Sequence, residues 1–293
     1  MKSLVEITQF RKTLDDFQLG PINLMIEPGT ITALVGNNGS GKSTLIKSMM
    51  GLVKSNQGTI KMFDQFVHQR DEGWKKEVAY QPQTTIGSDA FTGKALKDLV
   101  SHFYPNWDED LFTKVVQLLD IHLNKRFGKL SQGSQQKLNF ALTIARNAPL
   151  LILDEPTAHI DLLSKKIIID LLVDWMEEDE QRAIIISSHQ IEDIRKLSDY
   201  IYVLNNGHPV GHFEKESLTE SYQRYFLHNP LPETTIPGEV SRERHSFISE
   251  HPEETEHFLK KNGVEWSSQT NVELEEIMTI LLMKRTATTK EKG

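Results

Sequence analysis

Cysteine is absent from the 293-residue chain. Disulfide bonds, disulfide-linked partners and thiolate metal sites are therefore excluded, which is consistent with a cytosolic protein. Long apolar runs are missing too, because none approaches the roughly 18 residues that a membrane-spanning helix needs. The first segment, MKSLVEITQF, has too short an apolar run for a signal peptide. If the protein acts at a membrane, we expect another chain to carry the spans.

An excess of positive charge is also lacking. The chain has 33 lysines and arginines against 41 aspartates and glutamates, a formal net charge of -8. Such a balance argues against a nucleic-acid partner, because binding to the phosphate backbone is driven by basic patches. Hydrophobic residues make up 38% and charged residues 25%, which is typical of a soluble globular protein. The length predicts one large domain, alone or with an appendage.

Strand-like and helix-like segments alternate along the first 215 residues. Near-continuous runs of Ile, Leu and Val predict buried parallel strands, with helices on both faces of the sheet. We expect strands at 4–8, 22–26, 31–36, 59–63, 78–82, 150–154, 183–187, 200–204 and 208–213, and helices at 42–50, 134–147, 162–176 and 190–197. Apolar residues at helical spacing between 92 and 120 indicate a helical insertion, placed at about 84–146.

The composition changes after about residue 215. Segment 228–244 is rich in proline and charge, and predicts a linker or an irregular strand pair. Two amphipathic helices should follow, the second with Leu274, Ile277, Met278, Leu281 and Leu282 on one stripe. We therefore assign 216–293 to a small folded appendage, α+β or helical.

The segment GNNGSGKS, residues 36–43, fits the phosphate-loop pattern G-x-x-x-x-G-K-[ST], with a buried strand before it and a helix after it. Glycines let successive backbone N–H groups point at phosphate oxygens, and the helix adds its positive N-terminal end. Lys42 should reach the β- and γ-phosphates, and the Ser43 hydroxyl should bind Mg²⁺. The alternative is a chance Gly/Ser loop. The predicted nucleotide-binding residues here are Gly36, Asn37, Asn38, Gly39, Ser40, Gly41, Lys42, Ser43 and Thr44.

A carboxylate for the metal is expected at the end of the apolar segment LLILD. Asp154 stands at the C-terminal end of this predicted strand, where open α/β sheets bind their ligands. It should hold Mg²⁺, and Glu155 is placed to polarise a water aimed at the γ-phosphate. The alternative is an ordinary surface Asp-Glu pair after a core strand.

The motifs also follow one another in an order that resembles a known family. A phosphate loop, a helical insertion, KLSQGSQQK at 129–137 and LLILDEPTAHID at 150–161 resemble the nucleotide-binding domain of the ABC ATPase family over about residues 1–215. The family's signature, LSGGQ, binds the γ-phosphate held by the opposing subunit. Ser131 and Gly133 match it, whereas Gln132 and Ser134 depart from it. We expect this segment to have no partner in its own chain; the alternative is an ordinary serine helix cap.

Further positions carry over from the family one at a time. Gln83 in YQPQ resembles the Q-loop glutamine, which contacts Mg²⁺ or the attacking water; Asp161 in TAHID resembles the D-loop aspartate; and His189 in SSHQ resembles the switch histidine. The alternative for His189 is a structural or merely exposed histidine. The family's adenine-stacking aromatic is missing, because Thr13 and Leu14 fall near that place. Phe10 or Phe17 could substitute.

The resemblance implies an α/β P-loop NTPase of the ABC type, with N-terminal antiparallel strands, that binds and hydrolyses ATP with Mg²⁺. Glu155, His189, Gln83 and Lys42 would be catalytic, and the metal would meet Ser43, Gln83 and Asp154. Two such subunits, identical or different, would sandwich two ATPs and drive separate transmembrane permease subunits at the cytoplasmic face of the membrane. PNWDED at 105–110 and LEEIM at 274–278 resemble exporter ATPases. The alternatives are a soluble ABC ATPase with a non-membrane partner and a non-hydrolysing nucleotide sensor.

Overall fold

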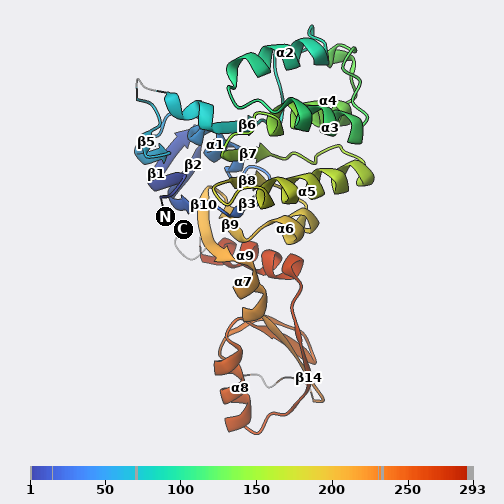
Figure 1. Cartoon of the computed structure of the whole chain (residues 1–293). Coiled ribbons are helices and arrows are strands. Elements are labelled where there is room, and N and C mark those ends of the chain that lie inside the picture. Colours follow the sequence, from blue (N-terminus) through green and yellow to red (C-terminus); the bar gives the residue numbers. More distant parts are fainter. Residues whose placement is uncertain (1, 15, 70–71, 230, 232–233, 289–293) are drawn as a thin grey trace. The chain divides into compact units, whose positions relative to one another are not determined.

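The computed structural model describes residues 2–14, 16–69, 72–229, 231 and 234–288. The chain divides into two compact units, Met1–Pro209 and Val210–Gly293. This division falls a few residues before the predicted boundary near 215, and the assignment of two domains stays a prediction. Figure 1 shows the elements of both units. No helix within the described ranges is long and apolar enough to cross a membrane.

A six-stranded sheet forms the centre of the first unit, in the order β10-β9-β3-β8-β7-β6. The pairs β6–β7, β7–β8, β8–β3 and β3–β9 are all parallel. All five residues of β3, β7 and β8 are buried, as their continuous apolar sequences predict. The strands are β3 (Ile31–Val35), β6 (Val78–Gln81), β7 (Leu150–Asp154), β8 (Ala183–Ser187), β9 (Tyr200–Asn205) and β10 (His208–Glu214).

An antiparallel sheet precedes it, in the order β2-β1-β4-β5. The sequence predicts two short strands at residues 4–8 and 22–26. In the structure β1 and β2 each have 10 residues, because they pair almost from end to end. Their apolar residues share one hydrophobic core with those of the parallel sheet. The strands are β1 (Val5–Leu14), β2 (Phe17–Ile26), β4 (Gln57–Met62) and β5 (Gln65–Phe66).

Helices follow the strands of the parallel sheet as expected. Helix α4 packs against β6, α1 against β7, and α5 against α6. They are α1 (Lys42–Met49), α4 (Gln132–Ile144), α5 (Leu162–Glu177) and α6 (Ile191–Leu197), with a 3-10 turn η1 (Gly73–Glu77) before β6.

The helical insertion contains α2 (Gly93–Phe103), α3 (Glu109–Leu118) and the 3-10 turn η2 (Phe127–Lys129). Thr92 and Asp108 cap the first two helices by accepting hydrogen bonds from Ala95 N at 3.2 Å and Leu111 N at 2.8 Å. Both helices contact α4, so the insertion rests on the helix that begins at the KLSQGSQQK segment.

The second unit has a core of its own. A four-stranded sheet in the order β12-β13-β11-β14 brings Tyr225 and Phe247 into a stack at 5.1 Å, and Leu259 packs on this pair from a helix. The elements are α7 (Lys215–Ser221), β11 (Gln223–Leu227), β12 (Glu239–Arg242), β13 (Ser246–Ser249), α8 (Pro252–Lys261), β14 (Trp266–Asn271) and α9 (Leu274–Thr288). The predicted stripe is buried at Leu274, Ile277, Met278 and Leu281.

Leu259→Ala should loosen this core selectively. The side chain is fully buried, so its truncation should cost about 2–5 kcal/mol through lost burial and a residual cavity. Amide hydrogen exchange should accelerate in β11 and β13 and stay unchanged in β3 and β7. Met283→Ala, at a position 66% exposed, is the control. Exchange that accelerates in β3 and β7 as much as in β11 would refute a separate core.

Candidate functional site

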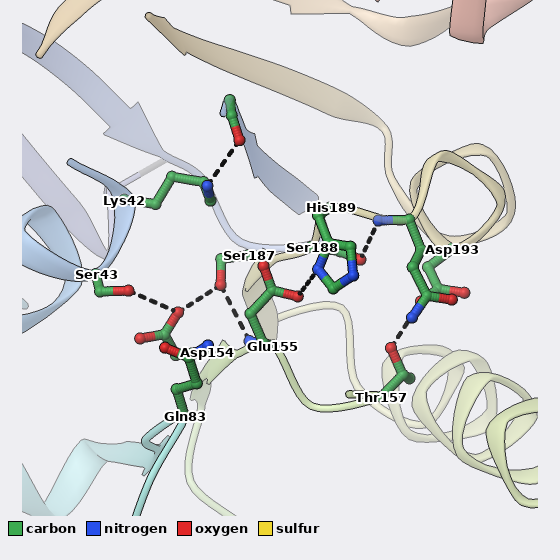
Figure 2. A network of polar contacts seen from close by, with 12 residues as sticks. Lys42, Ser43, Gln83, Asp154, Glu155, Thr157, Ser187, Ser188, His189 and Asp193 are labelled. Atoms are coloured by element: carbon green, nitrogen blue, oxygen red, sulfur yellow. Dashed lines mark hydrogen bonds and ion pairs between the residues drawn. The ribbon is translucent and has the colours of Figure 1, made fainter. Parts of the chain in front are cut away.

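Four neighbouring strands end at one edge of the parallel sheet, and each is followed by a predicted site segment. In the order β3-β8-β7-β6 these segments are the phosphate loop, the turn to His189, Asp154–Glu155 and the turn to Gln83. The register places Leu34, the next-to-last residue of β3, opposite Ser187, and Ser187 opposite Asp154. Figure 2 shows the resulting network of polar contacts. Segments scattered over 150 residues therefore meet because parallel strands share a carboxyl edge.

The phosphate loop owes its shape to two glycines. Gly41 has φ = 106°, a conformation that side chains rarely tolerate, and it caps α1. A Cβ on Gly36 would stand 2.1 Å from the Leu204 carbonyl oxygen of β9, so only glycine fits there. Loop and helix together therefore bring residues 38–44 to the wall of one cavity.

Lys42 is folded back onto this loop. Its Nζ donates to the carbonyl oxygens of Gly36 at 2.7 Å and Asn37 at 3.2 Å. Burial lowers the pKa of the Lys42 amine, and the carboxylates of Glu155 and Asp154 partly offset that effect. The Lys42 cation is thus held by loop carbonyls and is within electrostatic range of both acids.

A cavity of about 630 Å³ opens above the loop. Its walls bring together nearly all the predicted loop residues with Gln83 and Glu155, as the shared strand edge requires. The lining consists of Phe17, Asn38, Gly39, Ser40, Gly41, Lys42, Ser43, Thr44, Gln83 and Glu155.

Two of the three predicted metal ligands, Ser43 and Asp154, touch each other. Asp154 Oδ1 accepts hydrogen bonds from Ser43 Oγ at 3.3 Å and from Ser187 Oγ at 2.6 Å. Oxygen ligands of this kind, a carboxylate and a hydroxyl beside a phosphate loop, suit Mg²⁺, which keeps several waters and borrows phosphate oxygens. The donor set therefore fits the metal that the sequence implies.

Glu155 and His189 form the second contact of the network. His189 Nδ1 lies 2.7 Å from Glu155 Oε2 (Figure 2). Glu155 has φ = 54°, an uncommon value for a non-glycine residue, and its N–H donates to Ser187 Oγ at 3.0 Å. The turn is held in this conformation, so the carboxylate of Glu155 is aimed at the cavity side of the sheet edge.

The histidine is the exposed member of that pair. The side chain of His189 is 58% exposed, against 9% for Glu155. A ring with one edge on a carboxylate and the rest open can meet a ligand that enters from solvent.

The signature-like segment begins α4. Ser131 Oγ accepts a hydrogen bond from Ser134 N at 3.3 Å and lies 2.9 Å from Ser134 Oγ. Ser131 is exposed and is not part of the wall of the 630 Å³ cavity. The cap that the alternative interpretation invokes therefore exists, and it leaves the hydroxyl at the protein surface.

The expectation that the KLSQGSQQK segment has no partner in its own chain is wrong, because Gly133 and Lys137 both have contacts there. A Cβ on Gly133 would stand 2.5 Å from the His159 carbonyl oxygen, so the start of α4 abuts the turn that follows β7. One helical turn later, Lys137 Nζ pairs with Asp161 Oδ2 at 2.9 Å. The segment is thus fitted to the D-loop-like turn within one chain, for packing reasons that the motif alone does not reveal.

Asp161 is engaged as the cap of α5. Its Oδ1 accepts from Ser164 N at 2.9 Å and its Oδ2 from Ser164 Oγ at 2.8 Å. These hydrogen bonds, and then Lys137, hold the pKa of the Asp161 carboxyl well below its usual range. Its predicted contact with nucleotide is not made within its own chain's cavity.

Gln83 occupies the border between two hollows. It lines the 630 Å³ cavity and also a smaller one of about 150 Å³ beside Gln132 and His159. Its backbone carbonyl accepts from Gln136 Nε2 at 3.0 Å, and Gln136 Oε1 accepts from Gln81 Nε2 at 2.9 Å. A glutamine of α4 therefore sets the position of the Gln83 backbone.

Sequence interpretation did not predict a role for Ser187, and it left the adenine-stacking residue open between Phe10 and Phe17. Ser187 contacts both Asp154 and Glu155, and the only signal was a polar residue at the end of the apolar run AIIIS. Of the two aromatic candidates, Phe10 is fully buried in the core, whereas Phe17 lines the loop cavity. Burial was the deciding quantity, and sequence position alone did not contain it.

Ser187→Ala should weaken the site without unfolding it. It removes a hydrogen bond to a charged acceptor, worth about 1.5–3 kcal/mol, which corresponds to a loss of roughly tenfold or more in Mg²⁺-dependent ATP turnover. Ser198→Ala is the matched control, because Ser198 is equally buried and its hydroxyl donates to the Ile194 carbonyl in α6. The assay is phosphate release at graded Mg²⁺. Equal rates for the two variants would remove Ser187 from the site.

The chain is similar to several known proteins. A profile of the family described as ABC transporter matches residues 19–158. The ABC transporter ATP-binding protein YtrB of Bacillus subtilis is 30% identical over 220 residues, which cover 75% of either chain. The energy-coupling factor transporter ATP-binding protein EcfA2 of Ligilactobacillus salivarius is 28% identical over 89% of this chain and 96% of its own. A zinc uptake system ATP-binding protein, ZurA of Listeria monocytogenes, is 26% identical over 76% of this chain and 95% of its own.

Solved structures agree with the fold. The ATP-binding subunit of an ABC transporter superposes with a TM-score of 0.67 at 21% identity, over 74% of this chain and 92% of its own. A dimeric ATP-binding cassette bound to ADP and Pi gives 0.62 at 20% identity, over 72% and 98%. The predicted P-loop fold with an α/β sheet is thereby confirmed. The chain belongs to the ABC ATPase family, as an ATP-binding subunit of an ABC transporter.

Proposed function

We propose that the cavity above the phosphate loop is the ATP site and that Glu155 is the general base of hydrolysis. The observation that carries this proposal is the 2.7 Å contact of His189 Nδ1 with Glu155 Oε2, at the sheet edge that also holds Lys42 and Asp154. A base must be oriented by a neighbour and placed beside the reacting phosphate. In this proposal His189 orients Glu155, and the loop cavity that Glu155 lines would hold the phosphate.

Each residue has a distinct task in this mechanism. Lys42 gives up its carbonyl partners for phosphate oxygens, and the backbone N–H groups of residues 38–43 bind the remaining phosphate charge. Ser43 and Asp154 would hold Mg²⁺, with Gln83 at the border of the site; the metal, when bound, neutralises phosphate charge. Glu155 takes the proton of the attacking water, while His189 holds the carboxylate and presents its open ring edge to the γ-phosphate.

The site is completed by a second subunit in this proposal. Ser131 is exposed at the N-terminus of α4, with Gly133 beside it, and neither lines its own chain's cavity within the described residues. A hydroxyl and a helix N-terminus form a suitable anion-binding surface, so they are offered to the γ-phosphate held by a partner subunit. Asp161, which is 58% exposed, would approach the same interface.

Phe17 is the proposed adenine platform. It lines the loop cavity and also a neighbouring hollow of about 490 Å³, which Asp16, Gln18, Asn206 and His208 share. A ring at the junction of two hollows suits a nucleotide whose phosphates lie in one and whose base stacks in the other.

Separate membrane subunits are the proposed partners at the cytoplasmic face. Four apolar side chains are exposed between Gln83 and α3, namely Ile86 (91%), Phe91 (46%), Leu99 (50%) and Phe103 (64%). Exposed apolar groups of this kind favour a protein contact. We propose export as the direction, on the resemblance of 105–110 and 274–278 to exporter ATPases. Co-purification with a polytopic membrane protein, followed by transport in vesicles of known orientation, tests partner and direction in turn.

Glu155→Gln should abolish steady-state hydrolysis while ATP still binds. The substitution removes the base but retains Lys42, Ser43 and Asp154, so the dissociation constant for ATP should change by less than about threefold. An ATP-dependent dimer should then accumulate on gel filtration. Glu177→Gln, at the end of α5, is the control and should hydrolyse ATP normally. Undiminished phosphate release by Glu155→Gln would reject Glu155 as the base.

Ser131→Arg should stop hydrolysis without weakening ATP binding to the monomer. The hydroxyl lies outside its own cavity, so a bulky cation there would block only the closed dimer. Ser101→Arg, on the insertion helix α2, is the control for an added arginine. Loss of monomer ATP affinity in the Ser131 variant would contradict a role in the partner's site.

A further inference from the structure

A buried ion pair lies behind the Glu155–His189 contact. Lys165 Nζ of α5 is 2.6 Å from Asp193 Oδ1 in the first turn of α6. The Asp193 side chain is 1% exposed and that of Lys165 is 13% exposed. Neither residue lines the cavity above the phosphate loop. Since removing two charges from water is costly, such a pair calls for an explanation beyond stability.

The aspartate ties the pair to the Glu155 turn. Its second oxygen, Oδ2, accepts a hydrogen bond from Thr157 Oγ1 at 2.7 Å (Figure 2). Thr157 is buried and follows Glu155 by two residues, in the turn whose first residue has the uncommon φ of 54°. Asp193 therefore holds the far side of the turn that aims the Glu155 carboxylate.

The lysine ties the pair to the His189 turn. Its Nζ also donates to Gln190 Oε1, the side chain directly after His189. The Gln190 N–H donates to Ser188 Oγ at 3.0 Å, so the turn is bound on both sides of the histidine. Lys165 thus contacts the loop after β8, while its partner Asp193 contacts the loop after β7.

We propose that Lys165 and Asp193 are positioning residues for hydrolysis. Their ion pair clamps the two loops together, and the clamp keeps His189 Nδ1 within hydrogen-bonding distance of Glu155 Oε2. Neither residue touches the nucleotide. The pair acts through Thr157 on one loop and through Gln190 on the other, each within two residues of the group that it places. The inference rests on the proposed catalytic role of Glu155 and His189.

Packing and positioning separate in a double substitution. Removing one partner leaves a buried unpaired charge, so Lys165→Met or Asp193→Asn alone should lower the melting temperature. In Lys165→Met/Asp193→Leu both charges are gone, and an apolar contact of similar size can restore stability. The double variant should therefore melt near the parent protein yet keep a kcat at least tenfold lower. The dissociation constant for ATP should stay within twofold of the parent value, because the phosphate loop is untouched.

The experiment uses the full chain, with phosphate release, ATP binding and thermal melting measured in parallel. Lys165→Arg should retain most activity, since a guanidinium can bond both Asp193 and Gln190. Lys166→Met, at the exposed neighbouring position, is the matched control and should match the parent. NMR of the His189 imidazole adds a readout free of turnover: its hydrogen-bonded Nδ1 signal should shift or broaden in the double variant and stay unchanged in Lys166→Met.

The outcomes separate a failure of the positioning role from a failure of the proposed catalytic role of Glu155 and His189. Full kcat in the double variant, or an unchanged His189 signal, overturns the positioning role, whether or not the single variants are unstable. A fall in ATP affinity as large as the fall in kcat assigns the pair to general folding and also overturns it. If Glu155→Gln itself hydrolyses ATP at the parent rate, the proposed function fails first.

Discussion

The register of the parallel sheet is the constraint on which the site depends. Ser187 stands opposite Asp154, and a 2.6 Å hydrogen bond joins their side chains at the common carboxyl edge. A shift of one residue would turn these side chains to the other face. Because every residue of β3, β8 and β7 is buried, such a shift would also disrupt the packing on both faces of the sheet. The energy that specifies the fold is therefore the energy that assembles the polar network.

The same edge brings Lys42 and Asp154 into one site, yet the two side chains do not pair with each other. Lys42 is bound by the loop carbonyls, and Asp154 is bound by two hydroxyls. Each charge thus has a neutral partner that a phosphate or a metal can replace. The nucleotide would exchange one set of hydrogen bonds for a stronger, charge-assisted set, and the protein would need little rearrangement.

Contacts within the chain connect the signature-like segment to the rest of the site. Gly133 fits against the His159 carbonyl, and Gln136 holds the Gln83 backbone. A surface proposed to act on a partner's nucleotide is thereby attached to the turns that surround its own. A movement of helix α4 would displace Gln83 and the turn after β7, because Gln136 bonds the Gln83 backbone and Gly133 abuts the His159 carbonyl.

The sequence by itself determined the family, the alternation of strands and helices, and the residues of the loop, because these follow from local patterns and spacing. It also predicted the buried stripe of α9. Only the tertiary structure decided that Phe10 is core while Phe17 faces the cavity, that Ser187 joins Asp154, and that Lys165 meets Asp193. Those facts depend on pairing between strands and helices far apart in the chain, and on burial, which a linear pattern does not encode.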